Sequence, residues 1–159
     1  MRSFRLLALL SPLAFTACLS GSETQPQQGI PIDCATLATG LTAAEPTLTT
    51  TASGLKYRDQ TVGTGVATAS GMTVRIHYSG CLTNGTKFDE NTEPIDAPLQ
   101  FVIGDTQIID GFNEGMIGMK VGGRRQLVIP PDLGYGSTGN GPIPPDATLV
   151  FTIDLVAAQ

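Results

Sequence analysis

The side chains that could perform chemistry in this sequence are few, and they do not form a polar catalytic group. His77 is the single histidine, and no CxxC or HxxxH spacing occurs, so the sequence offers no metal-binding constellation. A Ser-His-Asp hydrolase is disfavoured because no GxSxG nucleophile elbow is present. Strand alternation places His77 on the opposite face from Tyr78, and we expect His77 to face solvent. The glycines around Tyr135 do not predict a phosphate loop, because no lysine follows them and a strand comes next.

Residues 134–155 combine a conformationally restricted loop with a strand that has one apolar face. Every second residue from Leu149 to Leu155 is apolar, and the side chains of a strand alternate between its two faces. In the preceding loop, glycines permit positive φ and prolines fix φ, so the loop should hold a defined shape. The loop presents Tyr135 and Ile143 beside the apolar strand. This setting favours an apolar peptide or a proline ring over a charged ligand.

Alternation also predicts the other strands that must position these residues. One strand is expected over 74–78 and another over 99–103, each with apolar residues at every second position. Asn84-Gly85 predicts a hairpin turn, because a tight turn of this kind requires positive φ. Two further strands are expected over 55–58 and 125–129.

One short helix is the only helical candidate. Asp110 is the expected N-cap, and Phe112, Met116 and Met119 recur at helical spacing. Two glycines inside this segment would each weaken an isolated helix by roughly 1 kcal/mol relative to alanine. The helix should therefore be held by packing against the sheet. The pattern predicts an α+β fold, with a largely antiparallel, curled β-sheet around one short α-helix.

Aromatic residues are scarce in this chain, yet they concentrate on the predicted inward faces. Four of the six Phe and two of the three Tyr fall on these faces. On the residues alone, a plain hydrophobic core explains this concentration better than an apolar pocket does, and both interpretations stay open at this point. The residues concerned are Tyr78, Phe88, Phe101, Ile108, Ile109, Phe112, Tyr135, Ile143 and Phe151.

The N-terminus predicts export. Residues 1–17 read as a signal peptide, with Arg2 and Arg5 before a short apolar run that is too short to span a bilayer permanently. The tetrad Phe15-Thr16-Ala17-Cys18 is similar to a bacterial lipobox, although Phe15 departs from the usual aliphatic residue. We expect a lipid anchor at Cys18 in the cell envelope or periplasm, and plain secretion with cleavage nearby is the alternative. Residues 18–52 read as a tether.

The charge balance disfavours nucleic acid as a binding partner, and the cysteine content allows one disulfide. The chain has 9 Lys and Arg against 14 Asp and Glu with no basic run, so nucleic acid is an unexpected partner. If Cys18 carries lipid, Cys34 and Cys81 remain as a pair in an oxidising compartment. One disulfide between them and two separate small apolar side chains are equally good interpretations of the sequence.

Four stretches in order resemble the FKBP-type peptidyl-prolyl cis-trans isomerases. They are SGLKYRDQTVGTG (53–65), VRIHYSGCLTNGTKFD (74–89), PLQFVIGDTQIIDGFNEGMIGMKVGGRRQLVIPP (98–131) and YGSTGN…IPPDATLVFTIDL (135–155). The resemblance runs over residues 53–157, about two-thirds of the chain. It implies an isomerase domain over 53–159 with an FKBP-like half-barrel. Exported members often carry a helical dimerisation arm, but the tether here has no sustained helical period, which favours a monomer.

The resemblance also assigns roles to individual residues. Phe112 matches the pocket floor, where many members have Trp, and Leu99 stands where many have Phe. Ile109 would offer its backbone N–H, and Tyr135 its hydroxyl, to substrate carbonyls. The stretch 90–97 lacks the Arg that often pairs with the family's Asp, and the loop tip at 140–143 is shorter than usual. The implied catalytic residues are Tyr78, Asp89, Phe112 and Tyr135, and the implied substrate-binding residues are Phe88, Phe101, Ile108, Ile109, Ile143 and Phe151.

The implied activity is rotation of X–Pro peptide bonds in extracytoplasmic proteins, which needs no nucleophile, metal or cofactor. Proline-containing polypeptides are the implied substrates, and macrolide immunosuppressants are candidate ligands. The alternative is a module of the same fold that binds peptides or acts as a chaperone on the cell envelope without useful turnover. A structural surface lipoprotein with an unrelated β-sandwich is a third interpretation, but it leaves the match from Tyr135 to Phe151 unexplained.

Overall fold

A computed structural model of the chain describes residues 48–93 and 96–159. The predicted signal peptide, Cys18, Cys34 and nearly all of the predicted tether lie outside these residues. The candidate site residues from Tyr78 to Phe151 all lie within them.

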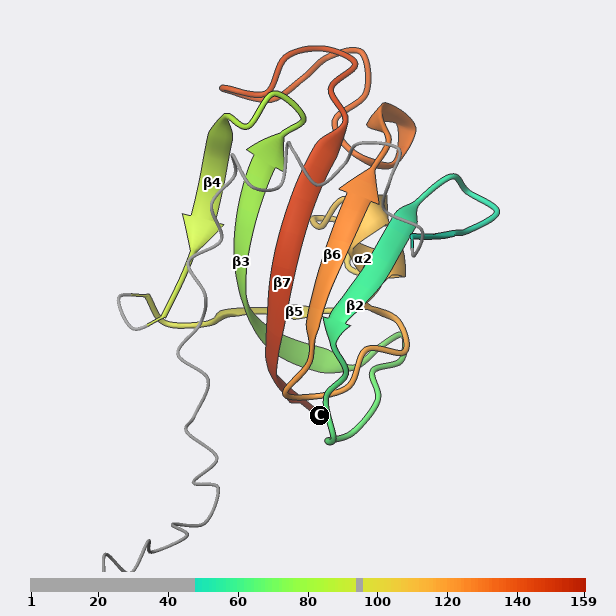
Figure 1. Ribbon diagram of the computed structural model, residues 1–159, viewed down its shortest axis with the longest axis vertical. Helices are drawn as coiled ribbons and strands as arrows, with labels where there is room; N and C mark the ends of the chain where they lie inside the picture. The colour runs from blue at the N-terminus through green and yellow to red at the C-terminus, as the bar shows by residue number, and fades with distance from the viewer. Residues whose placement is uncertain (1–47, 94–95) are drawn as a thin grey trace, which may run out of the picture.

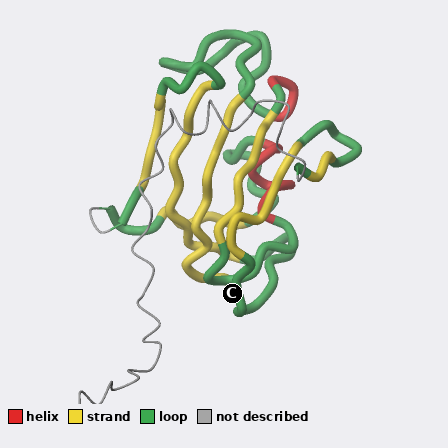
Figure 2. Tube along the Cα trace, viewed as in Figure 1, coloured by secondary structure: helices red, strands yellow, loops and turns green. Residues whose placement is uncertain are grey.

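The described part forms one antiparallel sheet with the strand order β1-β2-β6-β7-β3-β4, and β5 also pairs with β3 (Figures 1 and 2). This arrangement confirms the predicted curled antiparallel sheet with one short helix. The elements are β1 (Thr49–Thr50), β2 (Lys56–Thr61), β3 (Thr73–Leu82), β4 (Lys87–Asn91), β5 (Leu99–Val102), α2 (Asp110–Met116), β6 (Arg124–Ile129), the 3-10 turn η1 (Pro131–Leu133) and β7 (Leu149–Ala158).

Strand β3 organises the sheet. One of its edges pairs with β7 from Val74 to Leu82. Its other partners divide its length, because residues 73–76 pair with β5 and residues 78–81 pair with β4. The β3–β4 hairpin turns at Asn84-Gly85, and Gly85 has a φ of 87°, as the sequence predicted.

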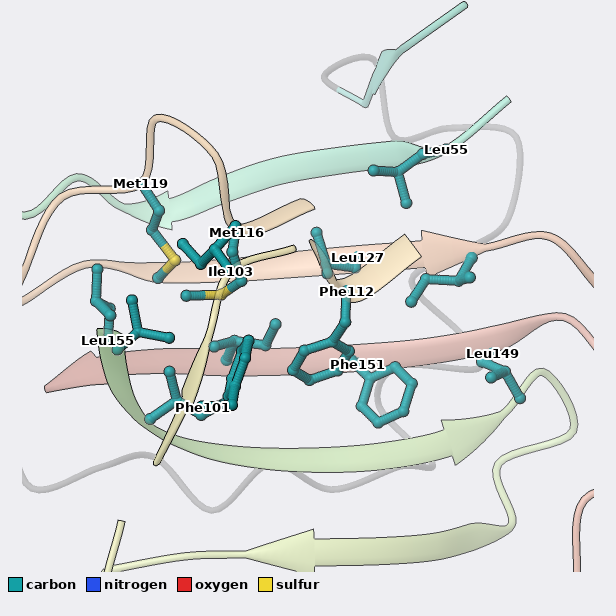
Figure 3. Close-up of a cluster of buried hydrophobic side chains, with 14 of the residues drawn as sticks. Leu55, Phe101, Ile103, Phe112, Met116, Met119, Leu127, Leu149, Phe151 and Leu155 are labelled. Atoms are coloured by element: carbon teal, nitrogen blue, oxygen red, sulfur yellow. The ribbon is translucent and has the colours of Figure 1, made fainter. Parts of the chain in front are cut away.

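The hydrophobic core lies on the face of the sheet that α2 covers, which we call the inner face (Figure 1). Figure 3 shows buried side chains of β6 and β7 gathered with those of α2 and the connecting loops. The predicted apolar face of β7 is confirmed, since Leu149, Phe151, Ile153 and Leu155 are all buried. The opposite face of the sheet is called the outer face below.

Helix α2 approaches the sheet closely because of two glycines. A Cβ atom at Gly111 would lie 2.4 Å from a methyl carbon of Ile129, and one at Gly115 would lie 2.5 Å from a methyl carbon of Leu127. Any larger residue would push the helix away from β6. The expectation that packing against the sheet holds the helix is therefore confirmed.

The predicted boundaries of this helix were wrong at both ends. Its N-cap is Ile109, which makes no side-chain capping bond, and Asp110 is the first helical residue. The helix ends at Met116, so Met119 lies beyond it, although Met119 is buried in the core. The helical path ends at Ile117, which is extended with a ψ of 133°, and Gly118 follows it with a φ of 75°, which favours glycine.

The C-terminal carbonyls of α2 are bound by two side chains from outside the helix. The Arg125 guanidinium donates to the carbonyl oxygens of Gly115 (2.9 Å) and Ile117 (3.0 Å), and the Thr68 hydroxyl donates to that of Met116. The same guanidinium binds both carboxylate oxygens of Asp59, at 2.6 and 3.0 Å. These contacts satisfy carbonyl groups that a helix end leaves unpaired, and they fix α2 to β6 and β2.

The expectation that His77 faces solvent was also wrong. His77 does lie on the outer face, but its exposure is only 4%. Its Nδ1 lies 2.9 Å from the Asn91 side-chain oxygen, and its Nε2 lies 3.2 Å from a Glu93 carboxylate oxygen. Strand alternation identifies the face on which His77 lies, but other chain segments determine whether that face is open.

Candidate active site

Five aromatic rings from five different elements meet on the inner face. Phe112 of α2 and Phe151 of β7 form the centre, with centroids 4.8 Å apart and ring planes at 89°. Tyr78 of β3 lies 6.0 Å from Phe112 and 6.1 Å from Phe151. Phe88 of β4 lies 5.5 Å from Phe151, and Phe101 of β5 lies 6.2 Å from Phe112. Figure 3 shows Phe101, Phe112 and Phe151 side by side between α2 and the sheet.

Edge-to-face packing of this kind depends on a glycine that the sequence analysis missed. Gly80 of β3 is paired with Phe151, and a Cβ atom on it would lie 2.7 Å from the Phe151 ring and 2.8 Å from the Phe88 ring. The absence of a side chain at Gly80 thus gives both rings their space. An isolated glycine within an alternating strand was the available signal, since such a glycine often marks a close approach.

A hydrogen bond joins the aromatic cluster to the carboxylate of Asp89. The Tyr78 hydroxyl donates to Oδ2 of Asp89 at 2.8 Å, and Oδ1 of Asp89 accepts from the backbone N–H of Glu90 at 2.9 Å. Burial raises the pKa of Tyr78 far above its ordinary value, and the hydrogen bond to Asp89 and its negative charge raise it further. Tyr78 therefore remains a neutral hydrogen-bond donor throughout the physiological pH range.

The loop that leads into α2 presents Ile108 and Ile109 at the edge of the cluster. Asn113 holds this loop, because its side-chain oxygen accepts from the N–H of Gly104 (2.8 Å) and its amide donates to the carbonyls of Asp105 (3.0 Å) and Ile108 (3.2 Å). Within the described residues, the backbone N–H of Ile109 has no hydrogen-bond acceptor. This donor is therefore free to bind a carbonyl oxygen. Sequence reasoning missed the role of Asn113, because it is one of three polar residues in the helix and its residue type does not single it out.

The loop between η1 and β7 carries Tyr135 and Ile143. Asn140 and Ile143 bond each other through both backbone N–H and C=O groups, at 3.0 and 2.9 Å. Gly139 has a φ of 70°, and a Cβ atom on it would lie 2.4 Å from the Ile143 carbonyl oxygen, so this tight turn requires glycine. Ile143 is buried in the core, and Tyr135 packs against it with its ring half-buried. Among the described residues, the Tyr135 hydroxyl has no hydrogen-bond partner.

The fold thus gathers the residues that the sequence analysis selected. Phe101, Phe112, Ile143 and Phe151 belong to the buried cluster, and Asp89 joins it through Tyr78. Leu99, the position where many members of the family have Phe, is 37% exposed at the edge. The catalytic and substrate-binding roles of these residues remain predictions. The other predicted residues, which are partly buried and pack against the cluster, are Tyr78, Phe88, Ile108, Ile109 and Tyr135.

Among residues 48–93 and 96–159, no group of three or more His, Cys, Asp or Glu side chains could hold a metal ion. No helix within these ranges is both long and apolar enough to cross a membrane. Cys81 is disulfide-bonded. Cys18 and Cys34 lie outside the described residues, so lipid attachment and the Cys34–Cys81 pairing remain predictions.

Comparisons with known proteins identify the family. The sequence model of the family of FKBP-type peptidyl-prolyl cis-trans isomerases matches residues 65–156 of this chain. The chain is 47% identical over 106 residues to FK506-binding protein 4 of Dictyostelium discoideum, covering 66% of this chain and 28% of that protein. It is 44% identical over 104 residues to the FK506-binding protein of Neisseria meningitidis serogroup B, covering 65% of this chain and 94% of that protein.

Solved structures agree with the sequence match. The crystal structure of FkpA from Escherichia coli superposes with a TM-score of 0.68 at 35% identity, covering 79% of this chain and 57% of that chain. The open antiparallel sheet with one short helix matches solved structures of this fold, among them the crystal structure of AtFKBP13, which has a TM-score of 0.65 at 35% identity and covers 71% of this chain and 99% of that chain. The chain therefore belongs to the FKBP-type peptidyl-prolyl cis-trans isomerases.

Proposed function

We propose that this protein accelerates cis-trans rotation of X–Pro bonds in extracytoplasmic proteins by stabilising the twisted amide in the aromatic cluster. The observation that carries the proposal is the Phe112–Phe151 pair, bordered by two hydrogen-bond donors that have no partner among the described residues. A prolyl ring is apolar and compact, and the edge-to-face pair provides an apolar floor for it.

The chemistry requires differential binding and no covalent step. An X–Pro bond prefers trans by about 0.5–1 kcal/mol, but rotation takes tens to hundreds of seconds because it interrupts C–N resonance. A twisted amide is less dipolar at oxygen than a planar one. Moving the prolyl ring from water into an apolar site therefore costs the twisted form less than the planar form. This difference lowers the barrier, because only interactions stronger in the transition state accelerate the reaction.

The donors at the rim add directional stabilisation. The backbone N–H of Ile109 is on the loop before α2 and the Tyr135 hydroxyl is on the loop before β7, and both residues pack against the cluster. We assign them to the carbonyl oxygens that flank the rotating bond. The neutral Tyr78 hydroxyl, held by Asp89, keeps a dipole at the mouth of the site without placing an unpaired charge there. A thousandfold acceleration requires only about 4 kcal/mol, which these terms can supply together.

The location that we propose is the cell envelope, with a lipid anchor at Cys18 and a monomeric domain. Arg2, Arg5, the short apolar run and Thr16-Ala17-Cys18 support export and lipid attachment. The proposed substrates are proline-containing segments of exported proteins. The same aromatic cluster is the proposed binding site for macrolides.

A non-catalytic peptide-binding module is the second candidate. It is favoured by Phe112 at the floor, in place of the family's frequent Trp, and by the 37% exposure of Leu99 at the rim. An isomerase assay on a series of X–Pro peptides, with the full mature chain, decides between the two. We expect acceleration with a preference for an apolar residue before proline. A rate equal to the uncatalysed background for every peptide would leave only the binding module.

A further inference from the structure

Asp89 and Asp96 are two exposed carboxylates beside the aromatic cluster, and neither forms an ion pair among the described residues. Asp89 accepts from the Tyr78 hydroxyl at 2.8 Å and from the backbone N–H of Glu90 at 2.9 Å. Oδ2 of Asp96 accepts from the backbone N–H of Thr92 at 3.1 Å. All three donors are neutral, so no positive side chain offsets either carboxylate.

Contacts of Asn91 hold Asp96 at the sheet edge next to Tyr78. Asn91 of β4 is paired with Tyr78 of β3, and its side-chain amide donates to the carbonyl of Ala97 at 2.9 Å. The backbone N–H of Asp96 donates to the carbonyl of Thr92 at 3.1 Å. These bonds return the chain to the end of β4, which brings Asp96 to the border of the aromatic cluster.

The ionisation of Tyr78 places both carboxylates on one side of the site. Burial contributes most to the raised pKa of Tyr78, and the hydrogen bond to Asp89 and the charges of Asp89 and Asp96 raise it further. The hydroxyl of Tyr135 acts in the same direction. Because charge interactions weaken with distance, the two carboxylates lie on the side of the cluster where the two phenols meet.

The basic side chains lie elsewhere. Nine Lys and Arg residues occur in the chain, and all except Arg2 and Arg5 lie within the described ranges. Arg125, on the inner face, is 6% exposed and is occupied by Asp59 and the carbonyls at the end of α2. Lys120 lies in the turn before β6, where it forms a β-bridge with Ala67. The strand register places the other five on the outer face, and they are Lys56, Arg58, Arg75, Lys87 and Arg124.

The sheet therefore separates the charges, with most positive groups on the outer face and two unpaired negative groups at the border of the site. The distances within the cluster show what part of a substrate would meet these negative groups. The Tyr78 ring lies 6.0 Å from Phe112 and 6.1 Å from Phe151, and its hydroxyl reaches Asp89. Two extended residues span about 7 Å. With a prolyl ring on the Phe112–Phe151 pair, a residue one or two positions away along the substrate lies beside Tyr78.

We propose that the site prefers substrates that carry Lys or Arg within two residues of the proline, because Asp89 and Asp96 pair with the cationic side chain. This inference rests on the proposed function, since the prolyl ring must occupy the aromatic cluster. The carboxylates do not create the site; they select among the peptides that enter it. The apolar residue directly before the proline and the cationic residue near it are read by different parts of the site.

The exposure of both carboxylates determines the size and the form of the effect. An exposed ion pair changes an equilibrium by up to about fivefold, and a like charge acts in the opposite direction. We therefore expect kcat/KM to differ about tenfold between a peptide with Lys and the matched peptide with Glu at low ionic strength. The difference should shrink to about threefold or less in 0.5 M NaCl. It should appear in KM rather than kcat, because the charge contact does not change as the amide rotates.

Two sets of X–Pro peptides test the preference with the full mature chain. Leucine precedes proline in every peptide, and Lys, Gln or Glu stands either directly before that leucine or directly after the proline. We expect the order Lys, Gln, Glu in kcat/KM in at least one set. Equal values in both sets, or a faster Glu peptide, would overturn the proposal, although acceleration of the Gln peptides would still support the isomerase function. If no peptide is accelerated, the isomerase function fails, and Kd values from fluorescence titration of the same peptides must then show the same order.

Neutral variants identify the groups responsible. Asp96→Asn keeps an oxygen that can accept from the N–H of Thr92 but removes the charge, so the ratio of the Lys rate to the Glu rate should fall about threefold. Adding Asp89→Asn should bring the ratio close to one. A loss of folded protein lowers both rates alike and leaves the ratio unchanged. Glu93→Gln is the matched control, because it removes the same charge from a carboxylate 3.2 Å from His77 on the outer face. An equal fall of the ratio in Glu93→Gln and Asp96→Asn would show an effect of net charge and would overturn the proposal.

Discussion

The ring of Phe112 stands edge-on to the ring of Phe151, with centroids 4.8 Å apart and planes at 89°. This contact joins the only α-helix among the described residues to the strand that pairs with both β3 and β6. Gly111 and Gly115 let the helix approach, and Gly80 leaves room for the Phe151 ring. The floor of the proposed site is therefore also part of the core, and its two roles must be separated experimentally.

A pair of substitutions on β7 separates them. Phe151→Ala and Leu155→Ala each remove a buried side chain, and we expect losses of about 3–5 and 2–5 kcal/mol in the free energy of unfolding. Only Phe151 contacts Phe112, so only Phe151→Ala should lower kcat/KM of the folded protein. Urea unfolding and isomerase assays well below each midpoint provide the two measurements. Equal loss of kcat/KM in both variants would show that the rings act only as core.

The Tyr135 hydroxyl is expected to act as a donor to substrate. Tyr135→Phe removes one oxygen that has no partner among the described residues, so the free energy of unfolding should change by less than about 0.5 kcal/mol. Loss of one transition-state hydrogen bond should lower kcat/KM about tenfold or more. Thermal unfolding and the X–Pro assay measure both effects. A variant that loses stability while its activity is retained would place Tyr135 in the core.

Asn113 is expected to position the Ile108–Ile109 loop. Asn113→Ala removes three hydrogen bonds to this loop, which should destabilise the protein by about 1–3 kcal/mol and lower kcat/KM about tenfold by displacing the Ile109 N–H. Ser53→Ala is the matched control, because it removes the contact with the adjacent Glu114 without touching the loop. Unchanged kcat/KM in Asn113→Ala at a temperature where it is folded would refute this role.

The strands that carry most of the core, β3, β6 and β7, could be predicted because their inner-face residues are apolar or small and mostly buried. In β7, alternation identified the inner-face residues Leu149, Phe151, Ile153 and Leu155, which are all buried, but it did not predict that Val150 and Thr152 on the opposite face are buried as well. The aromatic cluster could be predicted for the same reason. The resemblance to known isomerases added the expectation that the Ile109 backbone N–H and the Tyr135 hydroxyl bind substrate carbonyls.

What the sequence could not predict depends on contacts between distant segments. Asp is a residue type that is common at N-caps, and Asp110 was therefore expected there. The turn held by Asp105 and Asn113 starts the helix one residue earlier, so the N-cap is Ile109, which is extended with a ψ of 144°. His77 is buried, and its ring nitrogens lie near Asn91 and Glu93, which come 14 and 16 residues later in the chain. Neither relationship leaves a periodic signal in the sequence.

The raised pKa of Tyr78 predicts a stability change at alkaline pH. The native state keeps Tyr78 protonated above its ordinary value of 10.0, whereas the unfolded chain ionises there. The contribution is fully present below pH 10 and is lost as the pH rises further, so the free energy of unfolding should decline above about pH 10. Urea unfolding from pH 8 to 11 measures this decline, and phenolate absorbance follows the ionisation.

Two variants identify the group responsible. Tyr78→Phe should remove this part of the decline, and Asp89→Asn should lower the pKa of Tyr78 because it removes a nearby negative charge. If the alkaline decline of Tyr78→Phe equals that of the wild type, the effect arises elsewhere in the chain.

Cys18 is expected to carry the lipid anchor. A single acyl chain binds membranes only marginally, whereas two or three anchor a protein stably. The mature protein should therefore fractionate with membranes, and cleavage within residues 19–53 should release a soluble domain. Cys18→Ser should release the protein or stall its processing, while Cys34→Ser, the matched control, should leave it in the membrane fraction. Mass spectrometry of the mature N-terminus gives the direct measurement. An unmodified chain that begins at any residue other than Cys18 would establish a freely secreted or periplasmic isomerase.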